Sequence, residues 1–186
     1  ILLLGSWRPG YHPAWLGTSY VTQLSLARLT PRESLRMLQA VPQAAQFSEA
    51  LTQEVLAKAA GNPFFLEELT QAVVERSTEH LSTIPDTVQA VLAARIDRLA
   101  PEEKALLQQL AVIGREFPVS LIRQVITQPE DERYRLLASL QHKEFLYEQP
   151  AFPEVEYIFK HALTQEIAYS SVLIERRKVL HEQTAQ

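Results

Sequence analysis

Three residues of this chain stand where they could meet a ligand: Arg8, Pro63 and His161. Arg8 follows the apolar run Ile1–Leu4, and in open α/β sheets ligands bind outside the carboxyl ends of such strands. Its guanidinium carries a fork of donors that matches a phosphate group. A solvated loop arginine is the alternative interpretation.

Pro63 stands at a predicted corner between two helices. Gly61 can take the left-handed conformation that ends one helix, and Asn62 followed by proline is a start signal for the next. The first-turn amide groups and the flat proline ring would then face outward, where an aromatic or anionic ligand could bind. Gly-Asn-Pro is also a common turn without a ligand. Glu67 and Glu68 are expected to form a solvated first turn rather than an acid/base pair.

His161 follows the predicted strand Val155–Phe159 and stands at the start of a helix. From that position an imidazole can turn toward a neighbouring domain, and its charge changes near physiological pH. A capping histidine or a core histidine is the alternative interpretation.

The elements that would position these residues are mostly helices. Two short strands are expected first, Ile1–Leu4, buried on both faces in a parallel sheet, and Val21–Leu26. Thr30 and Glu33 then form a predicted capping box, and Ser48 caps the helix that ends at the corner. The next predicted helices run from Pro63 to about Arg76 and, after Pro85, from Asp86 to Leu99.

The predicted helix Asp86–Leu99 carries two arginines, Arg95 and Arg98. Either could sense a ligand or a neighbouring domain. Pairing at the surface with Asp97 or Glu102 is the expectation, because such pairs are common on exposed helices.

From Pro101 the pattern changes to three helices and a hairpin, which is the sequence plan of a winged-helix domain. A further helix begins near His161, and another amphipathic stretch runs from Glu175 to the end. The three helices begin at Pro101, Pro118 and about Glu130, and the two strands are Phe145–Glu148 and Val155–Phe159.

Three segments resemble parts of the STAND ATPases, the signal-transducing P-loop ATPases with numerous domains, and of their NB-ARC relatives. They are GNPFFLEEL at 61–69, IPDTVQAVLAARIDRL at 84–99 and FKHALTQEIAY at 159–169, in the family's order. The resemblance covers most of the chain and implies a nucleotide switch of the kind found with cyclase or kinase domains. It implies that Pro63 lies against adenine, that Arg8 faces the terminal phosphate as sensor 1, and that His161 contacts the β-phosphate of ADP. Lys160 and Ala162 flank this histidine where the NB-ARC relatives have Met and Asp.

The fold that the resemblance implies is mostly α, with the edge of an α/β P-loop ATPase sheet, then a helical lid bundle, then a winged-helix domain. The expected divisions are 1–30 for the last strands of the nucleotide-binding domain, 31–83 for the lid, 84–100 for a linker helix, 101–160 for the winged helix and 161–186 for the start of a C-terminal helical region.

The sequence contains no GxxxxGK[ST] phosphate loop and no apolar strand that ends in paired acids. By the resemblance these parts would precede Ile1, so the chain is expected to be a piece of a longer protein that binds ATP or ADP with Mg²⁺. The piece alone is expected to hold no cofactor and to hydrolyse no ATP, and no residue is assigned to catalysis or metal binding. Its partners would be the nucleotide, shared with an upstream P-loop domain, and effector or sensor domains of the same protein.

Composition narrows the class further. The chain is 46% hydrophobic and 22% charged, and its formal charge of −4 provides no basic field for nucleic acid or an anionic membrane. Between 101 and 160 ten acidic side chains stand against seven basic ones, which disfavours DNA binding. The lack of cysteine and of a bilayer-length apolar run favours a cytoplasmic protein without a membrane partner. The alternative function is a non-enzymatic helical protein-interaction or transcription-regulator module without nucleotide binding.

Overall fold

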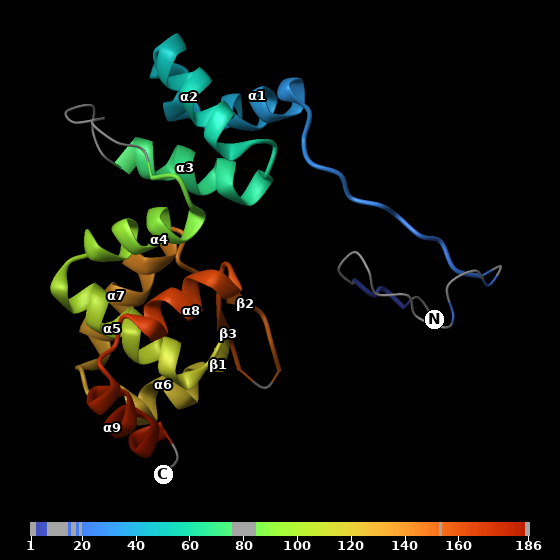
Figure 1. Cartoon of the computed structure of the whole chain (residues 1–186). Coiled ribbons are helices and arrows are strands. Elements are labelled where there is room, and N and C mark those ends of the chain that lie inside the picture. Colours follow the sequence, from blue (N-terminus) through green and yellow to red (C-terminus); the bar gives the residue numbers. More distant parts are fainter. Residues whose placement is uncertain are drawn as a thin grey trace.

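The computed structural model describes residues 3–6, 15, 18, 20–75, 85–152 and 154–184. Within these ranges the fold is mostly α-helical with one small three-stranded sheet (Figure 1). None of the helices in these ranges is long and apolar enough to cross a bilayer. Residues 31–75 form an N-terminal module, α4 follows, and residues 101–184 form a C-terminal module. The elements are α1 Pro31–Gln39, η1 Pro42–Gln46, α2 Glu49–Ala59, α3 Pro63–Glu75, α4 Val88–Asp97, α5 Pro101–Ile113, β1 Glu116–Pro118, α6 Val119–Val125, α7 Glu130–His142, β2 Leu146–Gln149, β3 Glu156–Phe159, α8 Ala162–Ser170 and α9 Ile174–Thr184.

The two strands predicted before α1 are absent from the described residues. Leu3 and Leu4 are 92% and 91% exposed, and residues 20–29 are extended without a strand partner, with Leu26 96% exposed. Figure 1 shows this segment leading away from the helices. A strand needs a neighbouring strand for its backbone N–H and C=O groups, and the described part of the chain places no strand beside this segment. The strand predictions at Ile1–Leu4 and Val21–Leu26 are therefore wrong for the residues that the structure describes.

The start signals of the first three α-helices are confirmed. The Thr30 hydroxyl accepts the Glu33 N–H at 3.3 Å, and the Glu33 carboxylate accepts the Thr30 N–H at 2.7 Å, which completes the capping box of α1. Ser48 caps α2 with its side chain. Asn62 Oδ1 accepts the Phe65 N–H at 3.2 Å, so α3 begins where the corner was expected.

The corner between α2 and α3 uses two left-handed residues in succession. Ala60 ends α2 with φ 47°, and Gly61 follows with φ 73°. The Leu29 N–H donates to the Gly61 carbonyl at 2.8 Å, and a Cβ on Gly61 would lie 2.4 Å from the Leu29 carbonyl oxygen. Glycine is required there by its backbone conformation and by this close approach of the chain before α1.

The elements after α1 follow their predicted order with three differences in detail. Helix α4 begins at Val88, because the Thr87 hydroxyl caps it by accepting the Ala90 N–H at 3.2 Å. The 3₁₀ helix η1 and strand β1 were not predicted. Strands β2 and β3 form the expected antiparallel hairpin, and β1 pairs with the other side of β3, which gives the sheet order β1-β3-β2.

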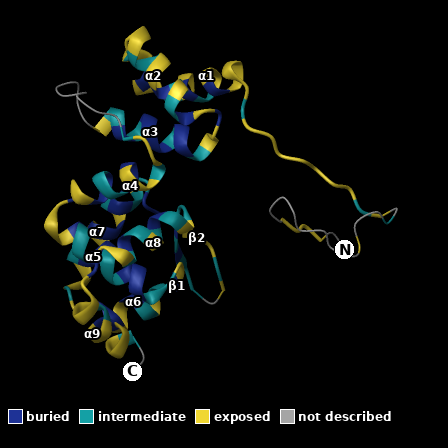
Figure 2. Ribbon diagram, in the orientation of Figure 1, coloured by how far each residue is buried: buried dark blue, intermediate teal, exposed yellow. Residues whose placement is uncertain are grey.

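Two apolar cores meet at α4. Val91 belongs to the core of α1–α3, whereas Ile96 belongs to the core that α5–α8 and the sheet enclose. Figure 2 shows buried residues on both sides of this helix. Because one short helix contributes to both cores, the two modules are packed against a common element. Leu180 of α9 and Val172 of the turn before it pack with Val112 at the end of α5.

Candidate functional site at the junction of α3, α4 and α8

Two of the three predicted site residues, Pro63 and His161, lie near each other, because Phe64 beside Pro63 contacts His161. Pro63 is exposed at the first position of α3, and His161 is half-buried just before α8. The ring centroid of Phe64, the residue after Pro63, lies 4.1 Å from that of His161, with the planes tilted by 46°. Arg8 lies outside the described residues. We call the contact region of α3, α4 and the start of α8 the junction.

His161 turns its Nε2 atom toward two carboxylates of α3. The atom is buried and has no hydrogen-bond partner among the described residues, with Glu67 Oε2 at 3.7 Å and Glu68 Oε1 at 3.8 Å. Burial lowers the pKa of His161; Lys160 and Arg95 lower it further, and Glu67 opposes them. The side chain makes no capping bond to α8, so the capping interpretation does not hold.

Lys160 connects the two modules directly. Its ammonium lies 2.6 Å from Glu67 Oε1 of α3 and 2.6 Å from Glu144 Oε2 in the turn before β2, and the side chain is 5% exposed. Burial alone would lower the pKa of Lys160, but the hydrogen bonds with Glu144 and Glu67 raise it above its usual value, so the ammonium stays charged. Glu144 holds φ 60°, which is uncommon for a residue other than glycine.

Arg95 forms a second connection, and it is buried at 2% exposure. Its guanidinium binds Glu68 through a short hydrogen bond and Glu75 Oε1 at 2.8 Å. It also donates to the Lys143 carbonyl at 2.8 Å and packs 4.8 Å from the ring centroid of Phe145. Burial raises the pKa of Glu68, and the neighbouring Arg95 opposes that rise. One side chain thus ties α3 and α4 to the turn before β2.

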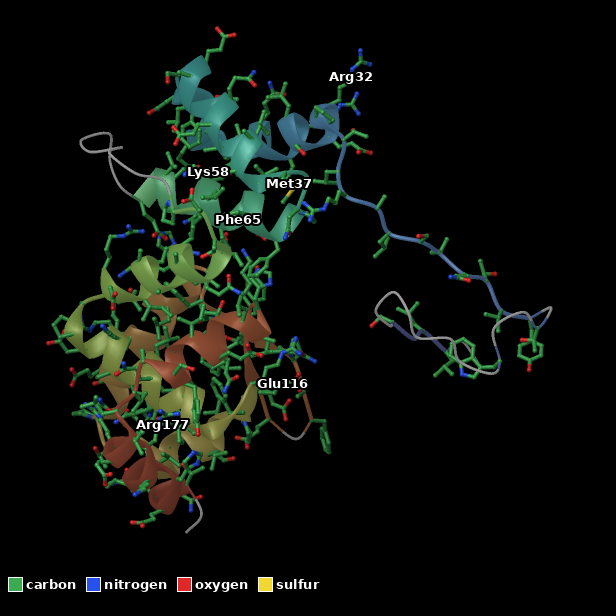
Figure 3. All side chains as sticks on the ribbon, in the orientation of Figure 1. Arg32, Met37, Lys58, Phe65, Glu116 and Arg177 are labelled. Carbon is green, nitrogen blue, oxygen red and sulfur yellow. The ribbon has the colours of Figure 1, made fainter. Side chains whose placement is uncertain are left out.

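These contacts correct two predictions from the sequence. Glu68 is 1% exposed rather than solvated, and Arg95 pairs inside the protein rather than at its surface. The sequence did contain a signal that both residues are buried. Glu68 lies three residues after Phe65, which is labelled on α3 in Figure 3 and packs in the core of α1–α3. Arg95 likewise lies four residues after the buried Val91. The helical period therefore puts both charges on inward faces.

Arg98 and Asp97 also find partners other than those predicted. Arg98 lies 3.5 Å from Glu75, and Asp97 pairs with Lys104 at 2.7 Å. Both pairs are partly exposed, so they contribute little to stability.

A cleft of ≈ 430 Å³ opens beside the junction. Three of its lining side chains are cationic, and each already binds a carboxylate: Arg95 and Arg98 bind Glu75, and Lys143 binds Glu103 at 2.6 Å. Each of these three cations is therefore already paired in this arrangement. The cleft is lined by Glu75, Arg95, Arg98, Leu99, Lys143 and Phe145.

Comparison with known proteins gives a distant relative. The chain is 28% identical, over 201 aligned positions that include 97% of it, to a protein of Rhizobium meliloti (strain 1021) described as Uncharacterized protein R02095. The chain spans 19% of the length of that relative. No model of a known protein family matches the chain.

Proposed function

We propose that this chain is the regulatory part of a STAND-type ATPase and that its junction responds to the bound nucleotide. In this proposal residues 31–75 belong to the helical lid and residues 101–160 form the winged-helix domain. The observation that carries the proposal is the contact of Phe64 with His161 at 4.1 Å between ring centroids. It brings the start of α3, at Pro63, to the histidine that follows β3, and these belong to two of the three segments that carry the resemblance.

The winged-helix assignment is supported by the order of elements in the C-terminal module. Helices α5, α6 and α7 precede the β2–β3 hairpin, and β1 adds a third strand between the first two helices. Glu130, Asp131 and Glu132 form the first turn of α7, where a DNA-reading helix would carry donors for phosphates. The proposed role of this domain is therefore contact with protein rather than with DNA.

In the intact protein, Pro63 would lie against adenine, Arg8 would face the terminal phosphate, and His161 would contact the β-phosphate of ADP. The phosphate loop and the Mg²⁺ ligands would come from an upstream domain. In the arrangement described here Nε2 of His161 faces Glu67 and Glu68, so a phosphate reaches it only after α3 shifts relative to α8. If ADP and ATP make different contacts with these residues, each nucleotide would favour a different arrangement of the junction. The change in arrangement would be the signal to effector or sensor domains in the cytoplasm.

The direct test is retention of ADP by the intact protein. His161→Ala should raise the dissociation rate of ADP by about tenfold, the factor that a lost contact of ~1.4 kcal/mol gives. His142→Ala is the matched control, because His142 is exposed at the end of α7. An intact protein that purifies without nucleotide, or that holds ADP equally well in both variants, would contradict the proposal.

A second candidate function is a permanent helical scaffold for protein contacts. It is favoured by the pairing at the junction, where carboxylates already bind the buried cations Lys160 and Arg95. Under this alternative the sequence before Ile1 would carry no phosphate loop, and the two modules would keep one arrangement with or without ATP.

A further inference from the structure

We propose that Lys160 is an anion-binding residue that Glu67 occupies in this arrangement, and that its ligand is a polyphosphate group. The identity of the ligand as a nucleotide phosphate rests on the proposed function. The site itself depends only on the chain described here.

The exposure of the three side chains supports exchange of one anion for another. The Lys160 side chain is 5% exposed, whereas its partners Glu67 and Glu144 are 35% and 44% exposed. The carboxylates therefore lie on the solvent side of a buried ammonium. An anion that arrives from solvent can replace one of them at low cost, because the released carboxylate is already partly hydrated. A phosphate offers more oxygen acceptors for the same charge-assisted hydrogen bond.

The unpartnered Nε2 of His161 is the second observation that points to this site. Glu67 holds Lys160 with Oε1 at 2.6 Å and presents Oε2 to His161 Nε2 at 3.7 Å. A phosphate in place of that carboxylate would lie within reach of both residues and would supply the acceptor that a neutral Nε2–H lacks. Glu68, the other carboxylate near Nε2, is held by Arg95 and so repels the anion less.

Glu67 is thereby a built-in competitor for the ligand. When an anion takes its place on Lys160, α3 loses one of its two charged connections described above, while the other, through Arg95, and the ring contact of Phe64 with His161 remain. Anion binding and loss of the Glu67–Lys160 pair are then the same event, which couples the ligand to the arrangement of the modules.

The test is titration of the 186-residue chain with inorganic pyrophosphate by isothermal calorimetry. Glu67→Gln should bind about fivefold more tightly than the unchanged chain, equivalent to ~1 kcal/mol, because the competitor has lost its charge. Lys160→Met should abolish binding, and Lys160→Arg should retain it. Glu54→Gln on the exposed face of α2 is the matched control for loss of one negative charge and should leave the affinity unchanged.

Three results would overturn the inference: no gain in affinity for Glu67→Gln, an equal gain for Glu54→Gln, or undiminished binding by Lys160→Met. Circular dichroism of each variant checks that its helices are intact, and Lys160→Arg separates loss of charge from loss of fold. The two proposals can fail separately. If one of these three results is obtained but His161→Ala still weakens the retention of ADP, the Lys160 site is disproved and the proposed function stands. An intact protein that never binds nucleotide removes the proposed function alone.

Discussion

Phe64 of α3 and His161 at the start of α8 pack ring against ring with centroids 4.1 Å apart. The contact lies beside two charged connections, in which Lys160 binds Glu67 and Arg95 binds Glu68. Aromatic packing and buried charge therefore meet at one place between two apolar cores. The stability of the arrangement should depend on these few side chains more than on the exposed ion pairs elsewhere.

Arg95→Met should destabilise the chain by about 3–5 kcal/mol, because it leaves Glu68 buried without its counter-charge. Arg98→Met removes a partly exposed arginine of the same helix and should cost less than about 1 kcal/mol. Urea unfolding followed by circular dichroism measures both. Equal effects of the two substitutions would show that the buried pair is not what holds α3 to α4.

The corner before α3 gives a second, purely steric prediction. Gly61→Ala should destabilise by roughly 2 kcal/mol or more, because φ is 73° and the new Cβ would meet the Leu29 carbonyl oxygen. Ala60→Gly, one residue earlier at φ 47°, should be neutral or stabilising by about 0.5 kcal/mol, since it relieves a left-handed alanine. Thermal unfolding of the pair tests this, and a reversed order would contradict the described turn.

His161 should make stability depend on pH with a defined sign. Its pKa is lowered in the folded chain, so the unfolded chain binds the proton more strongly. The contribution of neutral His161 to the unfolding free energy is present above the unfolded pKa of about 6.5. It is lost as the pH falls from there through the lowered pKa of the folded chain. Unfolding free energies should therefore fall more steeply between pH ~7.5 and ~5.5 for the unchanged chain than for His161→Gln.

The comparison with His161→Gln also cancels the pH dependence of stability that other titrating groups contribute. Burial raises the pKa of Glu68, which acts with the opposite sign as the pH falls, but that carboxyl is present in both chains. Parallel pH curves for the two chains would show that His161 titrates as it does in water.

The sequence predicted the structure correctly where neighbouring residues determine it. Thr30 with Glu33, Ser48 and Asn62 all cap the helices predicted for them, since capping depends on residues three apart. The hairpin β2–β3 was found to within a residue at each end. The strand predicted at Val21–Leu26 failed because pairing depends on a partner strand, and the apolar pattern carries no information about where that partner lies.

The site was harder to predict for the same reason. Pro63 and His161 were singled out by their positions beside turns, and the structure brings their surroundings together through Phe64. The charges between them were misread, because Glu68 and Arg95 are far apart in the sequence and each alone resembles a surface residue. The helical period indicates that both residues lie on inward faces of their helices. It does not indicate that they pair, because the pairing depends on the packing of α3 on α4.

We propose that bound nucleotide changes the junction, and a distance measured between the two modules tests this proposal most directly. The chain contains no cysteine, so Gln53→Cys on α2 and Glu166→Cys on α8, both exposed, can carry the two spin labels within it. In the intact protein, exchange of ADP for ATP with Mg²⁺ should change the label distance by about one helical turn, ~5 Å or more. A distance distribution that is the same with ADP, with ATP and without nucleotide would contradict the account.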